Sequence, residues 1–118
     1  MKNQKTFNDL EFNDHANVAG GIQAKLDLGN GFEISVVSMK EKEKTYGGLY
    51  GNASEGTYEV AVFHNDNMVP LSAFDDVIGW QDDVAISRLM KEINDNGLSW
   101  LNLLQEIRDE SRKELELD

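Results

Sequence analysis

Residues 22–38, with the sequence IQAKLDLGNGFEISVVS, hold the pattern that decides the fold. Apolar and polar side chains alternate over residues 22–28, so one face of an extended strand meets a core and the other meets water. Gly29-Asn30-Gly31 follows, and Asn-Gly accepts the positive φ angles of a tight hairpin turn. Residues 32–38 then place an apolar residue at every second position from Phe32 to Val36. The stretch predicts an antiparallel β-hairpin.

Further strands are expected after this hairpin. Residues 39–56, rich in charge and then in Gly and Tyr, are interpreted as a long loop with room for a short extended piece near Leu49. Residues 57–63 predict a third strand, and a turn follows at residues 65–67. A short fourth strand is expected at Met68, Val69 and Leu71, where Pro70 favours an edge position.

The pattern changes to helical spacing after residue 81. Asp82 and Asp83 suit the first turn of a helix, where the helix dipole favours negative charge. Asn96-Gly97 predicts the end of this helix, and Ser99 can cap a second one. The apolar positions of the first predicted helix are Ile86, Leu89, Met90 and Ile93, and those of the second are Trp100, Leu103, Leu104 and Ile107. Residues 98–118 are thus expected to form an appended helix with a solvated end.

The predicted fold class is α+β. We expect an antiparallel β-meander of three or four strands packed against one or two C-terminal helices, because a small sheet needs a helix to cover its apolar face. The length of 118 residues fits a single domain over residues 1–118, mostly β over residues 1–80 and mostly α over residues 81–118.

Composition and charge exclude several classes of function. The chain has 22 Asp and Glu against 11 Lys and Arg, a formal charge of −11. Direct nucleic-acid binding and docking on anionic lipid are not expected, because both depend on Lys and Arg. The absence of Cys excludes disulfides and thiolate zinc sites. No export signal or apolar membrane span is visible, so a cytoplasmic location is expected.

No catalytic constellation stands out in the sequence. His15 and His64 are the two histidines, and neither lies in a metal-ligand pattern. The glycines of residues 47–51 lack the Gly-Lys-Ser/Thr of a phosphate loop. Adjacent carboxylates do not by themselves supply the two different environments that acid–base catalysis needs. The expectation is a protein that is not an enzyme, with no catalytic, cofactor-binding or metal-binding residue.

Candidate protein-binding residues come from the loop, the acidic pairs and the last helix. Tyrosine is favoured at interfaces, and an apolar helix face needs a partner or a core. The candidates are Tyr46, Tyr50, Asp75, Asp76, Asp82, Asp83, Trp100, Leu104 and Ile107. The second tryptophan, Trp80, is instead expected in the core, stapled onto the first helix from the position before its N-cap. Trp100 is open to both readings, since it could pack on the first helix or face a partner.

Six segments in order give the chain a resemblance to a known family. The segments are Gly21–Lys25, Asn30–Val37, Gly47–Gly51, Tyr58–Val62, Asp75–Trp80 and Met90–Ile93. Over residues 21–93 the chain resembles a family of small acidic proteins encoded by bacteriophages and prophages. The resemblance carries over no enzymatic residue. Members of that family often end soon after the helix that stops at Ile93, so the helix at residues 98–116 is a departure from their pattern.

Three hypotheses about function follow. The leading one is a non-enzymatic, phage-encoded module that binds or inhibits a host protein, such as a nucleic-acid enzyme, through an acidic surface or the loop at residues 46–52. Spaced carboxylates could imitate DNA in a basic groove. The alternative is a structural or assembly protein that pairs with a second copy through the helix at residues 98–116. The third is an enzyme or small-ligand binder, which would need a pocket lined by His15, His64 or the Asp pairs.

Overall fold

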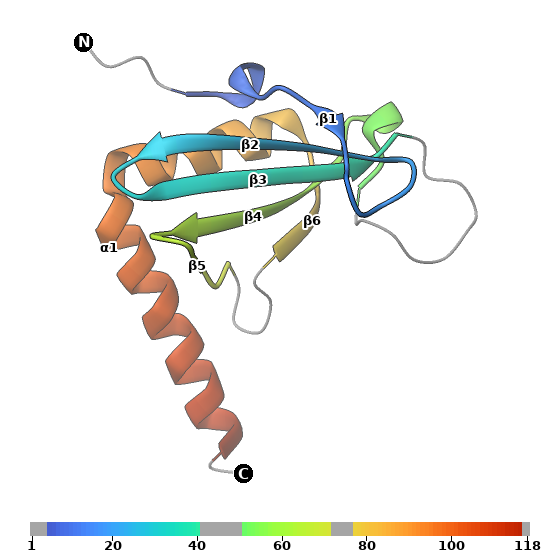
Figure 1. Cartoon of the computed structure of the whole chain (residues 1–118). Coiled ribbons are helices and arrows are strands. Elements are labelled where there is room, and N and C mark those ends of the chain that lie inside the picture. Colours follow the sequence, from blue (N-terminus) through green and yellow to red (C-terminus); the bar gives the residue numbers. More distant parts are fainter. Residues whose placement is uncertain (1–4, 41–50, 72–76, 117–118) are drawn as a thin grey trace.

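The computed structural model describes residues 5–40, 51–71 and 77–116, with the backbone alone for residues 111–116. Its strands form one antiparallel sheet against a long C-terminal helix, which confirms the α+β meander (Figure 1). The elements in chain order are the short 3-10 helix η1 (Phe7–Asp9), β1 (Asn13–Asp14), β2 (Gly21–Gly29), β3 (Phe32–Met39), the 3-10 helix η2 (Ala53–Glu55), β4 (Tyr58–His64), β5 (Asn67–Met68), β6 (Val77–Gln81) and α1 (Asp83–Glu116).

The β2–β3 hairpin is the predicted one. Its two-residue turn consists of Asn30 and Gly31, with φ angles of 54° and 86°. Two consecutive positive φ angles give the turn the twist of its flanking strands, which explains why Asn-Gly stands there. On the other side of β3 lies β4, in register from the Phe32–His64 pair to the Val37–Glu59 pair.

Several elements differ from the sequence-based expectation, and among them β1 and the two 3-10 helices were not predicted. The fourth strand is shorter than predicted: β5 covers only residues 67–68, and Val69 and Leu71 are buried beyond it. Strand β6 was not predicted, and it pairs with the same edge of β4 as β5 does. The two predicted helices join without an intervening loop, because α1 runs on through a sharp bend at Gly97. The predicted piece near Leu49 lies outside the described residues.

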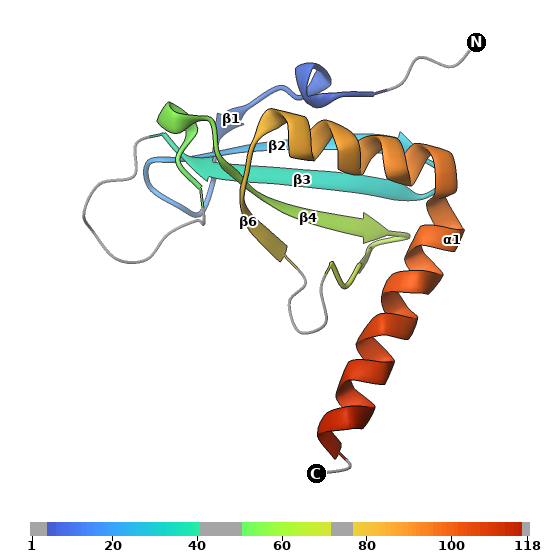
Figure 2. The same ribbon diagram turned by 180° about the vertical axis from the view of Figure 1, so that it is seen from behind.

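The core lies between one face of the sheet and the first half of α1, as Figure 2 shows from behind. Helix residues Ile86, Met90 and Ile93 are buried at i, i+4 and i+7 spacing. The sheet contributes the fully buried side chains of Phe32, Ile34, Val36, Val60 and Val62. At the N-terminus, the backbone N–H of Phe7 donates a 3.0 Å hydrogen bond to Ser87 Oγ, which ties η1 to α1.

Candidate protein-binding surfaces

The bend at Gly97 directs the last part of α1, residues 98–116, away from the sheet; we call this part the arm (Figures 1 and 2). Gly97 has φ 22° and ψ −98°, the non-helical conformation within α1. L-residues with a side chain rarely adopt such a positive φ. A Cβ at this position would also lie 3.4 Å from Cε2 of Phe32. Glycine therefore allows the chain to turn here without a loop.

The base of the arm folds back on the domain. Trp100 and Leu101 are each only 8% exposed and belong to the core cluster, together with Val69 and Leu71. The indole of Trp100 meets the ring of Phe32 edge-on, with centroids 6.2 Å apart. Trp100, a candidate binding residue from the sequence, is thus covered by the chain itself. Leu104, also a candidate, is partly buried against the same cluster.

Beyond its base, the arm carries exposed apolar side chains. Leu103 is 55% exposed and Ile107 is 44% exposed, one helical turn apart. Glu106 and Glu110 are both exposed, and each lies three residues after one of these apolar side chains. Spacings of three and four residues place all four on one side of a helix. We call this side, Leu103, Glu106, Ile107 and Glu110, the arm face.

A second exposed apolar corner lies where β6 passes into α1. Trp80 is 52% exposed, so the expectation of a core tryptophan is wrong. Tyr58 pairs with Gln81 and Val60 with Ile78, which leaves Gly79 and Trp80 as a bulge opposite one residue of β4. Trp80 has φ 58°, and a bulky side chain in that region costs on the order of 1–3 kcal/mol. The bulge turns the side chain outward instead of into the core.

Two acidic candidates from the sequence begin the helix beside this corner. Asp82 caps α1, because its Oδ1 accepts a 2.8 Å hydrogen bond from the N–H of Ala85. Asp83 Oδ1 accepts one of 2.9 Å from the N–H of Val84. Both carboxylates are exposed, and Val84 is 52% exposed. We call Trp80, Asp82, Asp83 and Val84 the Trp80 corner. The predicted helix start is confirmed, and both acids remain accessible from solvent.

Asp83 also affects the ionisation of Tyr58, which forms an aromatic cluster with Phe7 and Phe12. The ring of Tyr58 lies 5.1 Å from that of Phe7 and 5.4 Å from that of Phe12, centroid to centroid. Burial raises the pKa of the Tyr58 hydroxyl above its ordinary value of 10.0, and the carboxylate of Asp83 raises this pKa further.

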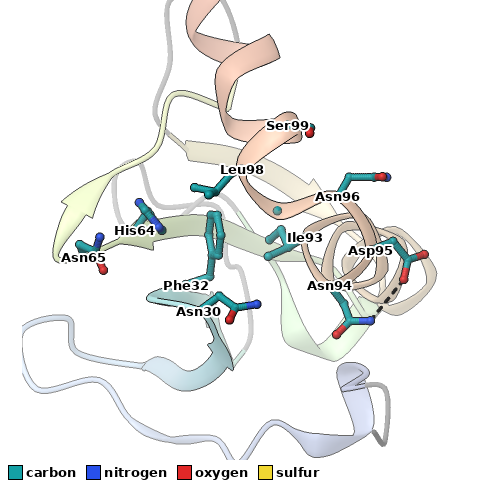
Figure 3. A pocket seen from close by; sticks show the side chains of 11 residues that line it. Asn30, Phe32, His64, Asn65, Ile93, Asn94, Asp95, Asn96, Leu98 and Ser99 are labelled. Carbon is teal, nitrogen blue, oxygen red and sulfur yellow. Dashed lines mark hydrogen bonds between the residues drawn. The ribbon is translucent and has the colours of Figure 1, made fainter. Parts of the chain in front are cut away.

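An open cleft of about 600 Å³ lies at the bend, between the β2–β3 turn, the β4–β5 turn and α1 (Figure 3). The ring of His64 packs against that of Phe32 in the wall of the cleft, with centroids 4.4 Å apart and ring planes tilted by 40°. Figure 3 shows Leu98 turned toward these two rings, while Asn96 and Ser99 point away from them. The lining of the cleft therefore combines apolar side chains, those of Phe32, Ile93 and Leu98, with a larger number of polar ones.

Asp95, the acidic residue in the lining of this cleft, is already paired with Lys91. Lys91 Nζ and Asp95 Oδ2 are 2.8 Å apart. The hydrogen bond from Lys91 holds the pKa of Asp95 below its usual value, and the same bond raises the pKa of Lys91. Both side chains are exposed, so this pair contributes little to stability.

The structure does not bring the two histidines together. His15 N–H donates to the carbonyl of Gly21 at the start of β2, whereas His64 pairs with Phe32 just beyond the other end of β2. Within the described residues, no three His, Asp or Glu side chains gather in a group that could hold a metal ion. A metal site shared by His15 and His64 is therefore absent from this part of the chain.

Four candidate binding residues lie outside the described residues: Tyr46, Tyr50, Asp75 and Asp76. Sequence reasoning missed Glu106 and Glu110, although their spacing from Leu103 and Ile107 was a readable signal. It also missed the exposure of Trp80, for which the sequence offers no signal.

No helix within the described residues is both long and apolar enough to cross a membrane.

Comparisons with known proteins add no functional assignment. No family model, curated protein or solved structure matches the chain.

Proposed function

We propose that the chain is a non-enzymatic protein-binding module and that the arm face binds a basic, amphipathic segment of a partner protein. The observation that carries the proposal is the pair Leu103 and Ile107, large aliphatic side chains that stand about half exposed on a projecting helix. Exposed apolar side chains on a projecting element are typical of interaction sites when polar groups surround them.

The charge of the arm face favours a basic partner over a second copy. Glu106 and Glu110 are exposed beside the apolar pair, in a chain of net charge −11. In a symmetric dimer the same patch of both copies meets across the axis, so these carboxylates would approach their own equivalents. Like charges across an interface weaken it, whereas Lys or Arg of a partner would pair with them. Self-association through the arm remains the alternative that the experiment separates.

Nucleic-acid-binding proteins are the class of partner that this charge fits, because their surfaces gather Lys and Arg. In its most specific form, the proposal is that the chain inhibits a nucleic-acid enzyme of a phage-infected host. Its carboxylates would then imitate DNA phosphates in the basic groove of that enzyme. The resemblance to small acidic phage proteins supports it. The described carboxylates lie on several elements, among them Asp27 and Glu33 opposite each other on β2 and β3.

The proposal is tested with a synthetic 20-residue helix that has Leu at i and i+4 and Lys at i+3 and i+7, followed by fluorescence anisotropy. We expect the wild-type chain to bind this peptide and not a version with Glu in place of Lys. Glu106→Gln with Glu110→Gln should weaken binding about tenfold, as expected for two exposed ion pairs. Leu103→Ala with Ile107→Ala should weaken it at least as much.

The matched control is Glu11→Gln with Glu92→Gln, which removes the same two charges from exposed positions outside the arm. Equal weakening by the control would show non-specific attraction and would overturn the proposal, as would no binding by the wild type. Light scattering separates the alternative, because a dimer that Leu103→Ala with Ile107→Ala disrupts would assign the arm face to a second copy.

A further inference from the structure

The Trp80 corner is a second exposed surface, and its features do not depend on the arm. It lies at the start of α1, whereas the arm begins after Gly97, some 15 residues or about 22 Å along the helix. The indole of Trp80 and the side chain of Val84 are each 52% exposed. Large apolar groups so exposed carry a hydration cost that burial against a partner removes.

The backbone holds Trp80 in this outward position. The pairs on either side of the bulge, Ile78 with Val60 and Gln81 with Tyr58, belong to the sheet. Trp80 between them has φ 58°, a conformation that a bulky residue adopts only when its surroundings impose it. The backbone that carries the indole is therefore held by the sheet on both sides, so little backbone ordering is needed when a partner binds.

Two exposed carboxylates, Asp82 and Asp83, follow Trp80 within three positions in the chain, and they determine which group this corner suits. Asp82 and Asp83 each use one oxygen, Oδ1, as a helix acceptor. A carboxylate has a second oxygen with its own lone pairs. A cation over an indole face is attracted by the ring quadrupole, and arginine adds a planar fork that matches a carboxylate. No neutral or anionic group gains from both features.

We propose that the Trp80 corner binds an arginine side chain of a partner protein, with the guanidinium stacked on the indole of Trp80 and hydrogen-bonded to Asp82 or Asp83. The aliphatic part of the arginine then lies against Val84. This site is separate from the arm face and is a second point of contact with a basic protein.

The test is an NMR titration of the two indole N–H signals with capped Gly-Arg-Gly and with capped Gly-citrulline-Gly, which has nearly the same shape and no charge. Trp80→Phe assigns the signals, since Trp100 is the other tryptophan. We expect the Trp80 signal to shift with the arginine peptide, and the citrulline peptide to bind at least about threefold more weakly. The Trp100 signal should stay in place.

Asp82→Asn with Asp83→Asn should weaken the arginine peptide by a similar factor, because Asn retains the helix cap while the charge is lost. Asp66→Asn with Asp109→Asn removes two exposed charges elsewhere and should leave the binding unchanged. Equal shifts with both peptides, equal weakening by both pairs of variants, or an unmoved Trp80 signal would each overturn the proposal. Loss of peptide binding at the arm face would leave this result unaffected, so the two proposals fail separately.

Discussion

At the scale of single residues, Tyr58 links the aromatic cluster to the start of α1. Its ring packs against Phe7 and Phe12, and Asp83 raises the pKa of its hydroxyl. The neutral hydroxyl is thus favoured in the folded protein. Because the folded pKa lies above the unfolded value of 10.0, this contribution is complete below pH 10 and is lost as the pH rises through the folded pKa.

We expect Tyr58 to ionise above pH 10 and Asp83→Asn to lower its pKa toward the ordinary value. Tyrosinate absorbance near 295 nm, compared between the wild type and Tyr58→Phe, isolates this residue from the other two tyrosines. A Tyr58 that titrates at or below pH 10, or a higher pKa in Asp83→Asn, would contradict the prediction. Asp27→Asn, near the β2–β3 turn, removes the same charge elsewhere in the fold and is the control.

The two tryptophans show what sequence reasoning reaches at this scale. Trp100 falls on a helical stripe with Leu104 and Ile107, so the periodicity indicated an apolar face. Whether that face met the domain or a partner depended on the direction of the arm, which Gly97 sets. Trp80 was misplaced because its exposure follows from a bulge, and the bulge follows from pairing with residues some 20 positions earlier in the chain.

At the scale of elements, local signals were sufficient where they agreed with one another. The β2–β3 hairpin has strict alternation and an Asn-Gly turn, and the structure has both strands within one residue of the expectation. β6 has a glycine at its centre and no alternation, so only its contact with β4 defines it. Asn96-Gly97 predicted the end of a helix, and the structure has a bend at Gly97 instead. Glycine is suited to both because each requires a non-helical backbone conformation.

The N-cap of α1 provides a prediction at this scale. Asp82→Ala removes the acceptor for the N–H of Ala85 and should lower the free energy of unfolding by about 1 kcal/mol. Asp82→Asn should retain most of the stability, since Asn caps helices about as well. Urea unfolding followed by circular dichroism measures both. Glu92→Ala, an exposed acid on the same helix, is the control; an equal loss there would refute the assignment of the cap.

At the scale of the whole molecule, the arm is part of the core at its base and an extension at its end. Trp100 and Leu101 close the end of the core, next to Phe32, Val69 and Leu71. The sequence predicts that residues 98–118 form an appended helix. Their base instead covers side chains that would otherwise meet water.

A chain that ends at Asp95 should therefore be less stable by about 3 kcal/mol or more, since it loses two large buried side chains. A chain that ends at Glu110 keeps Trp100, Leu101 and Leu104 and should stay within about 1 kcal/mol of the full chain. Urea midpoints distinguish the two. Equal stability of the full chain and the Asp95 truncation would mean that the arm does not close the core.

The bend at Gly97 makes the arm a lever whose pivot is a single residue. From residue 98 to residue 116 the arm measures about 28 Å, so a rotation of ~10° at the pivot moves its far end by about 5 Å. The first turns of the arm, held by Trp100 and Leu101, limit that rotation. The position of the arm face relative to the sheet is thus set by two backbone angles and two side chains, and a substitution at Gly97 would change where this face points without changing its chemistry.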